Sequence, residues 1–165
     1  MILVIGYGNP LCGDDGLGPY VAGRLAEADD ELGGGIECLS IHQLTPELAE
    51  PISQAGTVIF VDAAIGKTPG GVTCYKLARS TRKPNTTPEA FTHHVNPGAL
   101  LENAELLYGR RPAAYLYTVS GRNFALGDCF SPAVEAALPG LLERMKARIL
   151  RCTNLVSLNP SSSRY

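Results

Sequence analysis

Residues 2–18 read ILVIGYGNPLCGDDGLG: an apolar run, a glycine-rich loop and an acidic pair. A short β-branched run bounded by glycine and proline is typical of a central parallel strand, so residues 2–5 are predicted to form one. A helix is expected over residues 16–27, where leucine, valine and tyrosine recur at helical spacing. A strand, a loop and a helix in this order indicate the first unit of an α/β domain.

The rest of the chain repeats this alternation. Further strands are predicted over residues 36–41, 58–61, 72–77 and 113–120, and further helices over residues 45–56, 97–108 and 131–151. Residues 72–77 alternate more between apolar and polar side chains, so this strand is expected to be antiparallel or at an edge. Thr45 and Ser131 are expected as N-caps. The pattern predicts one three-layer α/β/α sandwich around a mostly parallel sheet of about five strands, covering residues 1–152, with residues 153–165 as a frayed tail.

The composition is that of a soluble globular protein. Of the 165 residues, 45% are hydrophobic and 18% are charged, and the net charge is −2, which gives no argument for binding to nucleic acid or an anionic membrane. No run approaches the ~20 apolar residues of a membrane span, and no basic segment precedes the first strand. We therefore expect a cytoplasmic protein, and a monomer because no coiled-coil pattern is present.

The five cysteines stand singly and are odd in number, which favours neither a zinc site nor a disulfide framework. Most are expected to be small buried hydrophobic residues in a reducing compartment. Cys12 lies in the loop of residues 6–18, here called the acidic loop because it carries Asp14 and Asp15, and could be a nucleophile. No neighbour in the sequence would activate its thiol, so a structural role is favoured.

Side chains that suit a metal are predicted to gather at one edge of the sheet. Asp15 follows the first strand, Asp62 is expected to end the third, and His93 and His94 precede a helix. Ligands of open parallel sheets lie beyond the carboxyl ends of the strands, and two carboxylates with one imidazole suit a divalent first-row metal. Each residue also has a simpler role: an aspartate can cap the next helix or bind turn amides, and a loop histidine can be solvated.

Other glycine-loop chemistries fit less well. Gly6-Tyr7-Gly8 opens like a dinucleotide-binding motif, but Leu11 stands where the third glycine belongs. No carboxylate follows the second strand, where residues 41–43 read IHQ, so a ribose-binding acid is missing. The common serine-hydrolase, zinc-protease and P-loop motifs are also absent from the sequence.

The same residues resemble the hydrogenase maturation endopeptidases over nearly the whole chain. The resemblance is carried by the loop of residues 6–18, by Val61-Asp62-Ala63, by residues 92–101 with their histidine pair, and by residues 126–139. It implies a phosphorylase/hydrolase-like fold and an aspartic-type or nickel-dependent endopeptidase. Such an enzyme removes the C-terminal extension from the nickel-loaded large-subunit precursor of a [NiFe]-hydrogenase, which then closes its active site.

By this resemblance, the residues that contact the metal and support catalysis are Asp15, Asp62 and His93, with His94 as the alternative histidine. Many relatives carry glutamate where Asp15 stands. The nickel is either the mark that the precursor already carries or a catalytic ion that activates water, and we favour the first. The polar loop of residues 79–92 is either a grip on the precursor or a solvated loop.

Two other functions remain open from the sequence. One is a binding or chaperone domain that reads the metal state of a partner without protease activity. The other is a metal-assisted hydrolase of small molecules. The length of the motif in residues 6–18 favours the endopeptidase over the small-molecule hydrolase.

Overall fold

A computed structural model describes residues 1–79 and 95–158, the last four of these by their backbone only. His93, His94 and all but the first residue of the polar loop 79–92 lie outside this part of the chain. Among the described helices, none combines the length and the apolar character that crossing a membrane requires.

Five strands form one sheet in the order β2-β1-β3-β5-β4. The strands β1 (Ile2–Tyr7), β2 (Ile36–Ile41), β3 (Thr57–Ile65) and β5 (Ala113–Gly121) run parallel to their neighbours. The edge strand β4 (Val72–Lys76) pairs antiparallel with β5. The predicted antiparallel edge strand and the mostly parallel five-stranded sheet are both confirmed.

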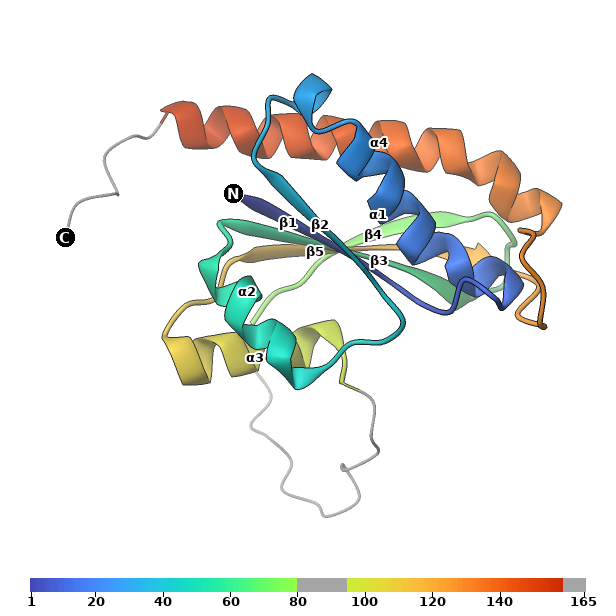
Figure 1. Cartoon of the computed structure of the whole chain (residues 1–165), viewed down its shortest axis with the longest axis horizontal. Helices are drawn as coiled ribbons and strands as arrows, with labels where there is room; N and C mark the ends of the chain where they lie inside the picture. The colour runs from blue at the N-terminus through green and yellow to red at the C-terminus, as the bar shows by residue number, and fades with distance from the viewer. Residues whose placement is uncertain (80–94, 159–165) are drawn as a thin grey trace, which may run out of the picture.

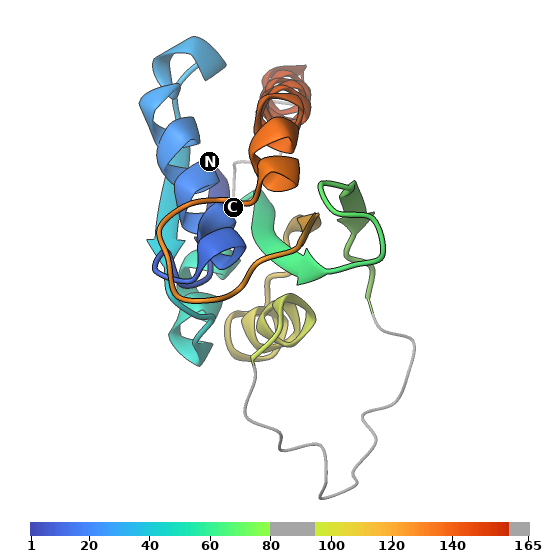
Figure 2. The same cartoon turned by 90° about the vertical axis from the view of Figure 1, so that its right-hand side faces the viewer.

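Helices cover both faces of the sheet and complete the three layers (Figure 1, Figure 2). One face carries α1 (Leu17–Glu27) and α4 (Pro132–Leu158), and the other carries α2 (Ala49–Gln54) and α3 (Pro97–Tyr108). Short 3₁₀ turns form at η1 (Gly13–Gly16), η2 (Asp30–Leu32) and η3 (Pro46–Leu48). The predicted three-layer α/β/α sandwich is therefore confirmed.

The first strand shows why both faces must be covered. Ile2 and Val4 belong to the core beneath α1 and α4, whereas Leu3 and Ile5 belong to the core beneath α2 and α3. All four side chains are buried, as the continuous apolar run predicts for a strand between two layers of helices. Ion pairs add little beside this apolar burial.

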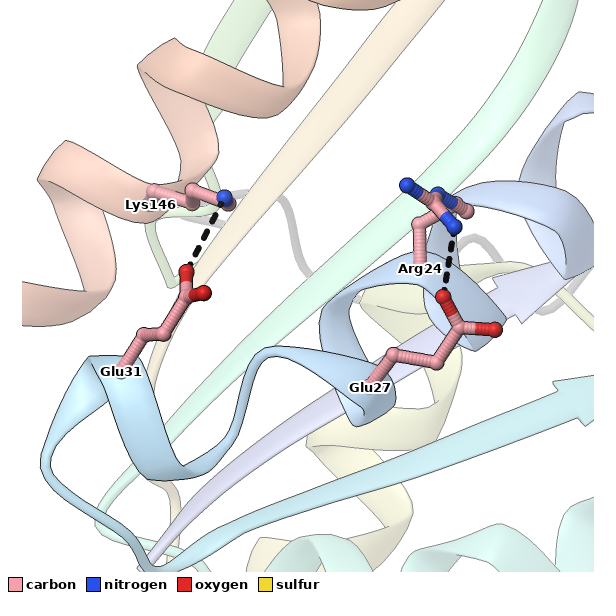
Figure 3. Close-up of polar contacts among 4 residues, drawn as sticks. All are labelled: Arg24, Glu27, Glu31 and Lys146. Atoms are coloured by element: carbon pink, nitrogen blue, oxygen red, sulfur yellow. Dashed lines mark hydrogen bonds and ion pairs between the residues drawn. The ribbon is translucent and has the colours of Figure 1, made fainter.

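Two exposed ion pairs lie at the outer surface of the layer formed by α1 and α4 (Figure 3). Arg24 lies 2.6 Å from Glu27 within α1, and Lys146 of α4 lies 3.7 Å from Glu31 of η2. Exposed pairs of this kind contribute about 0–1 kcal/mol each. The position of α4 is therefore set mainly by its buried apolar side chains.

A glycine allows α1 to approach the sheet at the end of β1. A Cβ atom on Gly18 would lie 2.3 Å from the carbonyl oxygen of Tyr7 and 2.7 Å from that of Val61. Only a residue without a side chain fits this close to the two strands, so the start of α1 is held against the end of β1 and against Val61 within β3.

Several boundaries differ from the sequence prediction. The helix predicted over residues 45–56 is a 3₁₀ turn at Pro46–Leu48 followed by α2 at Ala49–Gln54, and Thr45 precedes the turn without a side-chain cap hydrogen bond. The first strand extends to Tyr7. Asp62 was expected to end its strand, but β3 continues to Ile65, because β5 still pairs with it as far as Gly121. Pairing of β3 with β1 stops earlier, at Gly6 and Val61. Asp62 is thus the first residue of β3 beyond the reach of β1. The last helix, expected to end near Arg151, extends to Leu158.

Candidate functional site

A cavity of about 460 Å³ opens at the carboxyl ends of β1, β2 and β3. Asp15 and Asp62 both line it, although 46 residues separate them in the sequence. Its full lining among the described residues is Tyr7, Gly8, Asp15, His42, Gln43, Leu44, Asp62, Ala63 and Val95. The structure thus brings the two predicted carboxylates to one place, at the sheet edge where ligands of parallel α/β folds bind.

The loop between β1 and α1 fixes Asp15. Its Oδ2 accepts a hydrogen bond of 2.7 Å from the backbone N–H of Asn9. Gly8, at φ +135°, passes so near that a Cβ atom there would lie 2.0 Å from the carbonyl oxygen of Asp15. The Asn9 side chain in turn accepts from the N–H of Leu11 at 2.9 Å. Asp15 is therefore held on the cavity side of a tightly folded loop.

The carboxyl group of Asp62 has a pKa above its ordinary value. Burial raises the pKa of its carboxyl group, the hydrogen bond from the Tyr7 hydroxyl lowers it, and the charge of Asp15 raises it again, leaving it at about 6. Burial and the neighbouring Asp62 carboxylate raise the pKa of Tyr7 above its ordinary value, so the phenol stays protonated as the donor. Two carboxylates that repel each other in a partly desolvated cavity favour a bound cation or a shared proton.

The neighbouring Asp14 has a structural role. It is fully buried, and its carboxylate accepts from the backbone N–H groups of Arg122, Asn123 and Ser131 and from the Ser131 hydroxyl, at 2.6–2.9 Å. Burial raises the pKa of Asp14, but these four bonds outweigh that effect and leave the pKa lowered. Asp14 thus ties the acidic loop to the segment between β5 and α4.

The simpler expectation of helix capping is wrong for this acidic pair. The hydrogen bonds of Asp14 and Asp15 go to segments other than the helix that follows them. Ser131 precedes α4 as an N-cap would, and its carbonyl accepts from the Glu135 N–H at 2.9 Å. Its hydroxyl, however, donates to Asp14 at 2.8 Å.

The backbone around Cys12 is tied to the segment that precedes α4. Cys12 forms an isolated parallel β-bridge with Gly127, and the N–H of Gly13 donates to the Gly127 carbonyl at 2.7 Å. It is partly buried and does not line the cavity. Cys38, Cys74 and Cys152 pack against the core beneath α1 and α4, whereas Cys129 is exposed.

The cavity also contains three polar residues that the sequence did not point to. Tyr7 ends β1, and His42 and Gln43 directly follow β2. Tyr7 is in register with Ile41, so the residue that follows β2 lies at the same edge of the sheet as the acidic loop. The register is known only from the structure, so the sequence did not single out His42; residues 41–43 were noted only because they lack a ribose-binding acid.

The donor set fits a metal ion that brings ligands of its own. Within residues 1–79 and 95–158, no group of three histidine, cysteine or acidic side chains is arranged to hold a metal. Two carboxylates in an open cavity can still complete the shell of an ion whose other ligands come from elsewhere. The position of the predicted histidine lies outside the described residues, so its part in the site stays a prediction.

Comparison with known proteins gives matches among solved structures only; no protein-family model and no curated protein matches the chain. The hydrogenase maturating endopeptidase HybD from E. coli superposes with a TM-score of 0.69 at 23% identity, over 92% of this chain and 93% of that chain.

Two structures from Thermococcus kodakarensis also match this chain. The [NiFe] hydrogenase maturation protease HycI from Thermococcus kodakarensis KOD1 gives a TM-score of 0.67 at 22% identity, over 91% of this chain and 92% of its own. HybD from Thermococcus kodakarensis gives 0.66 at 21%, over 90% and 98%. The chain therefore has the fold of the hydrogenase maturation endopeptidases.

Proposed function

We propose that the protein is an endopeptidase that removes the C-terminal extension from the nickel-loaded large-subunit precursor of a [NiFe]-hydrogenase. The observation that carries the proposal is the pairing of Asp15 and Asp62 in one cavity, at the carboxyl edge of a sheet with the fold of the maturation proteases. The resemblance of the loop of residues 6–18 to that family supports it. The cytoplasmic location and monomeric state expected from the sequence belong to the same proposal.

Asp15 and Asp62 are proposed to contact the nickel that the precursor already holds, with His93 as the third contact and His94 as its alternative. Val95, two residues after His93 in the sequence, lines the cavity, which supports placing a histidine of this segment near the carboxylates. Nickel is then part of the substrate, and an empty precursor lacks the feature that the two carboxylates recognise. This accounts for cleavage that waits for metal insertion.

The chain's own groups supply proton chemistry at the same place. A metal at the carboxylates would polarise a carbonyl or a water molecule. With no metal bound, Asp62, whose pKa is about 6, can hold a proton close to neutral pH, and a cation at Asp62 would lower that pKa and displace the proton. The Tyr7 hydroxyl donates to Asp62 and fixes the direction of its carboxyl group.

The test is to incubate purified protein with nickel-loaded and nickel-free large-subunit precursor and to measure the intact mass of the precursor. We expect loss of a discrete C-terminal peptide from the loaded form alone. Asp15→Asn, Asp62→Asn and His93→Ala should each abolish the loss, whereas His94→Ala should preserve it. An unchanged mass with every precursor tried would refute the protease and favour a binding domain that reads the metal state.

A titration separates the two roles of nickel. If nickel is the mark on the precursor, the isolated protein should bind it weakly, because two carboxylates and one imidazole form an open set of hard-to-borderline ligands. Tight stoichiometric binding of nickel in calorimetry, lost in Asp15→Asn, would instead show a resident catalytic ion.

A further inference from the structure

We infer that His42 and Gln43 form a substrate-binding wall of the cavity that hydrogen-bonds the peptide backbone of the precursor beside the scissile bond. The inference rests on the proposed protease function and adds to it the part of the site that holds the polypeptide. It is carried by the placement of the two side chains, by the absence of side-chain bonds from them to other described residues, and by the chemistry of the remaining described lining.

The two residues are held in place by their neighbours. The carbonyl oxygen of Ile41 accepts a hydrogen bond of 3.1 Å from the N–H of Gly8. The residue before His42 is therefore bound to the acidic loop. Leu44, the residue after Gln43, is 8% exposed and packs into the core beneath α2 and α3. Between these two anchors the side chains of His42 and Gln43 are exposed and line the same cavity as both carboxylates.

Both side chains are free to bind a ligand. Neither makes a side-chain hydrogen bond or ion pair with any other residue in the part of the chain that the structure describes. A glutamine amide offers two donors and an acceptor, and a neutral imidazole offers one of each, which matches the N–H and C=O groups of a peptide unit. A polar side chain anchored at its backbone but unbonded at its tip is suited to pair with an incoming chain.

The other described side chains of the lining are not available to donate a hydrogen bond to a peptide carbonyl group. Ionised Asp15 and Asp62 only accept hydrogen bonds, so they cannot bind a peptide carbonyl oxygen. The Tyr7 hydroxyl already donates to Asp62. The rest of the described lining is glycine or apolar in its side chains. Among the described lining side chains, His42 and Gln43 are therefore the available donors for the carbonyl groups of the precursor.

The two sides of the cavity thus bind different parts of the substrate. The carboxylates on the side of β1 and β3 face the cation, and the amide and imidazole on the side of β2 face the polypeptide. Removing a contact that is equally strong in the bound substrate and in the transition state raises KM and leaves kcat unchanged. This kinetic pattern distinguishes a substrate-binding wall from a group that takes part in the chemistry.

The experiment measures steady-state cleavage of nickel-loaded precursor by wild type, His42→Ala, His42→Gln, Gln43→Leu and the matched control Gln54→Ala. Gln54 is an exposed glutamine of α2 outside the cavity lining. For His42→Ala and Gln43→Leu we expect KM to rise about five- to tenfold, with kcat within about twofold of wild type. His42→Gln keeps a donor and an acceptor and should recover most of the loss, and Gln54→Ala should behave as wild type.

Each result decides the inference. Unchanged KM in both His42→Ala and Gln43→Leu, with wild type active, would overturn it. A drop in kcat of about a hundredfold at unchanged KM would also overturn it, because the residue would then act on the reacting atoms. Failure of the wild type to cleave any precursor would instead be a failure of the proposed function. Thermal unfolding of each variant excludes misfolding as the source of a raised KM.

Discussion

Asp62→Asn is expected to stabilise the protein while it abolishes cleavage. The fold raises the pKa of Asp62 from 3.8 to about 6, which corresponds to an upper bound of about 3 kcal/mol at neutral pH. Asp62 is partly exposed and the repulsion from Asp15 is screened by solvent, so we expect about 1–2 kcal/mol. Asparagine has nearly the same shape without the charge and should recover this amount.

The sign of the pH dependence follows from linkage. Because the native state binds a proton at Asp62 more tightly than the unfolded state, the stability of the wild type is highest below the unfolded pKa and falls as pH rises through about 6. The free energy of unfolding of Asp62→Asn should therefore exceed that of wild type by about a third of the full amount near about pH 4.5 and by the full amount near about pH 8.

Urea unfolding of both proteins across this pH range measures the difference, and thermal unfolding should show a Tm increase of roughly 2–8 °C at the alkaline end. Asp30→Asn, at an exposed position in η2, is the control and should show no such trend. A stability difference that stays flat with pH, or a variant less stable than wild type at about pH 8, would refute the reasoning that Asp62 is a destabilised carboxylate.

Three further changes test the surroundings of the site. Asp14→Asn should lose about 2–4 kcal/mol in urea unfolding, since an amide cannot accept all four buried hydrogen bonds; a loss below about 1 kcal/mol would contradict the role of Asp14 as a tie. Tyr7→Phe removes a donor that lowers the pKa of Asp62, so an NMR titration of the Asp62 carboxyl carbon should move to higher pH, and an unmoved titration would exclude the bond. Gly18→Ala should lose about 1–3 kcal/mol in thermal unfolding through its clash with the carbonyl oxygens of Tyr7 and Val61. Gly23→Ala, on the same helix with open space around it, should gain up to about 1 kcal/mol; equal effects would contradict the close approach.

Much of the fold was predictable because it depends on local patterns. The continuous apolar run of residues 2–5 marked a strand buried on both faces, and the alternating residues 72–77 marked the antiparallel edge. The end of β3 was not predictable in the same way. Residues 62–65 stay in the strand because β5 is long enough to pair with them, and no local pattern reports the length of a partner strand.

The candidate site was predictable only in part. Asp15 and Asp62 could be placed at one sheet edge from the order of strands and loops alone. His42 could not, because its place depends on which strand lies beside β1, and the order β2-β1-β3 is a property of the whole sheet. The role of Asp14 was hidden for a similar reason, since its hydrogen-bond partners lie 108–117 residues further along the chain.

That separation in sequence determines when, during synthesis, the hydrogen bonds of Asp14 can form. The acidic loop is among the first segments to be made, but the N–H groups that hold Asp14 belong to Arg122, Asn123 and Ser131. A nascent chain that stops short of Ser131 therefore carries the loop without the partners that shape it. Contacts between such distant segments form late, because the intervening chain must first be ordered. The hydrogen bonds of Asp14 cannot be complete until Ser131, the residue before α4, has been made, so a loop that is synthesised early is held by a turn that is synthesised late.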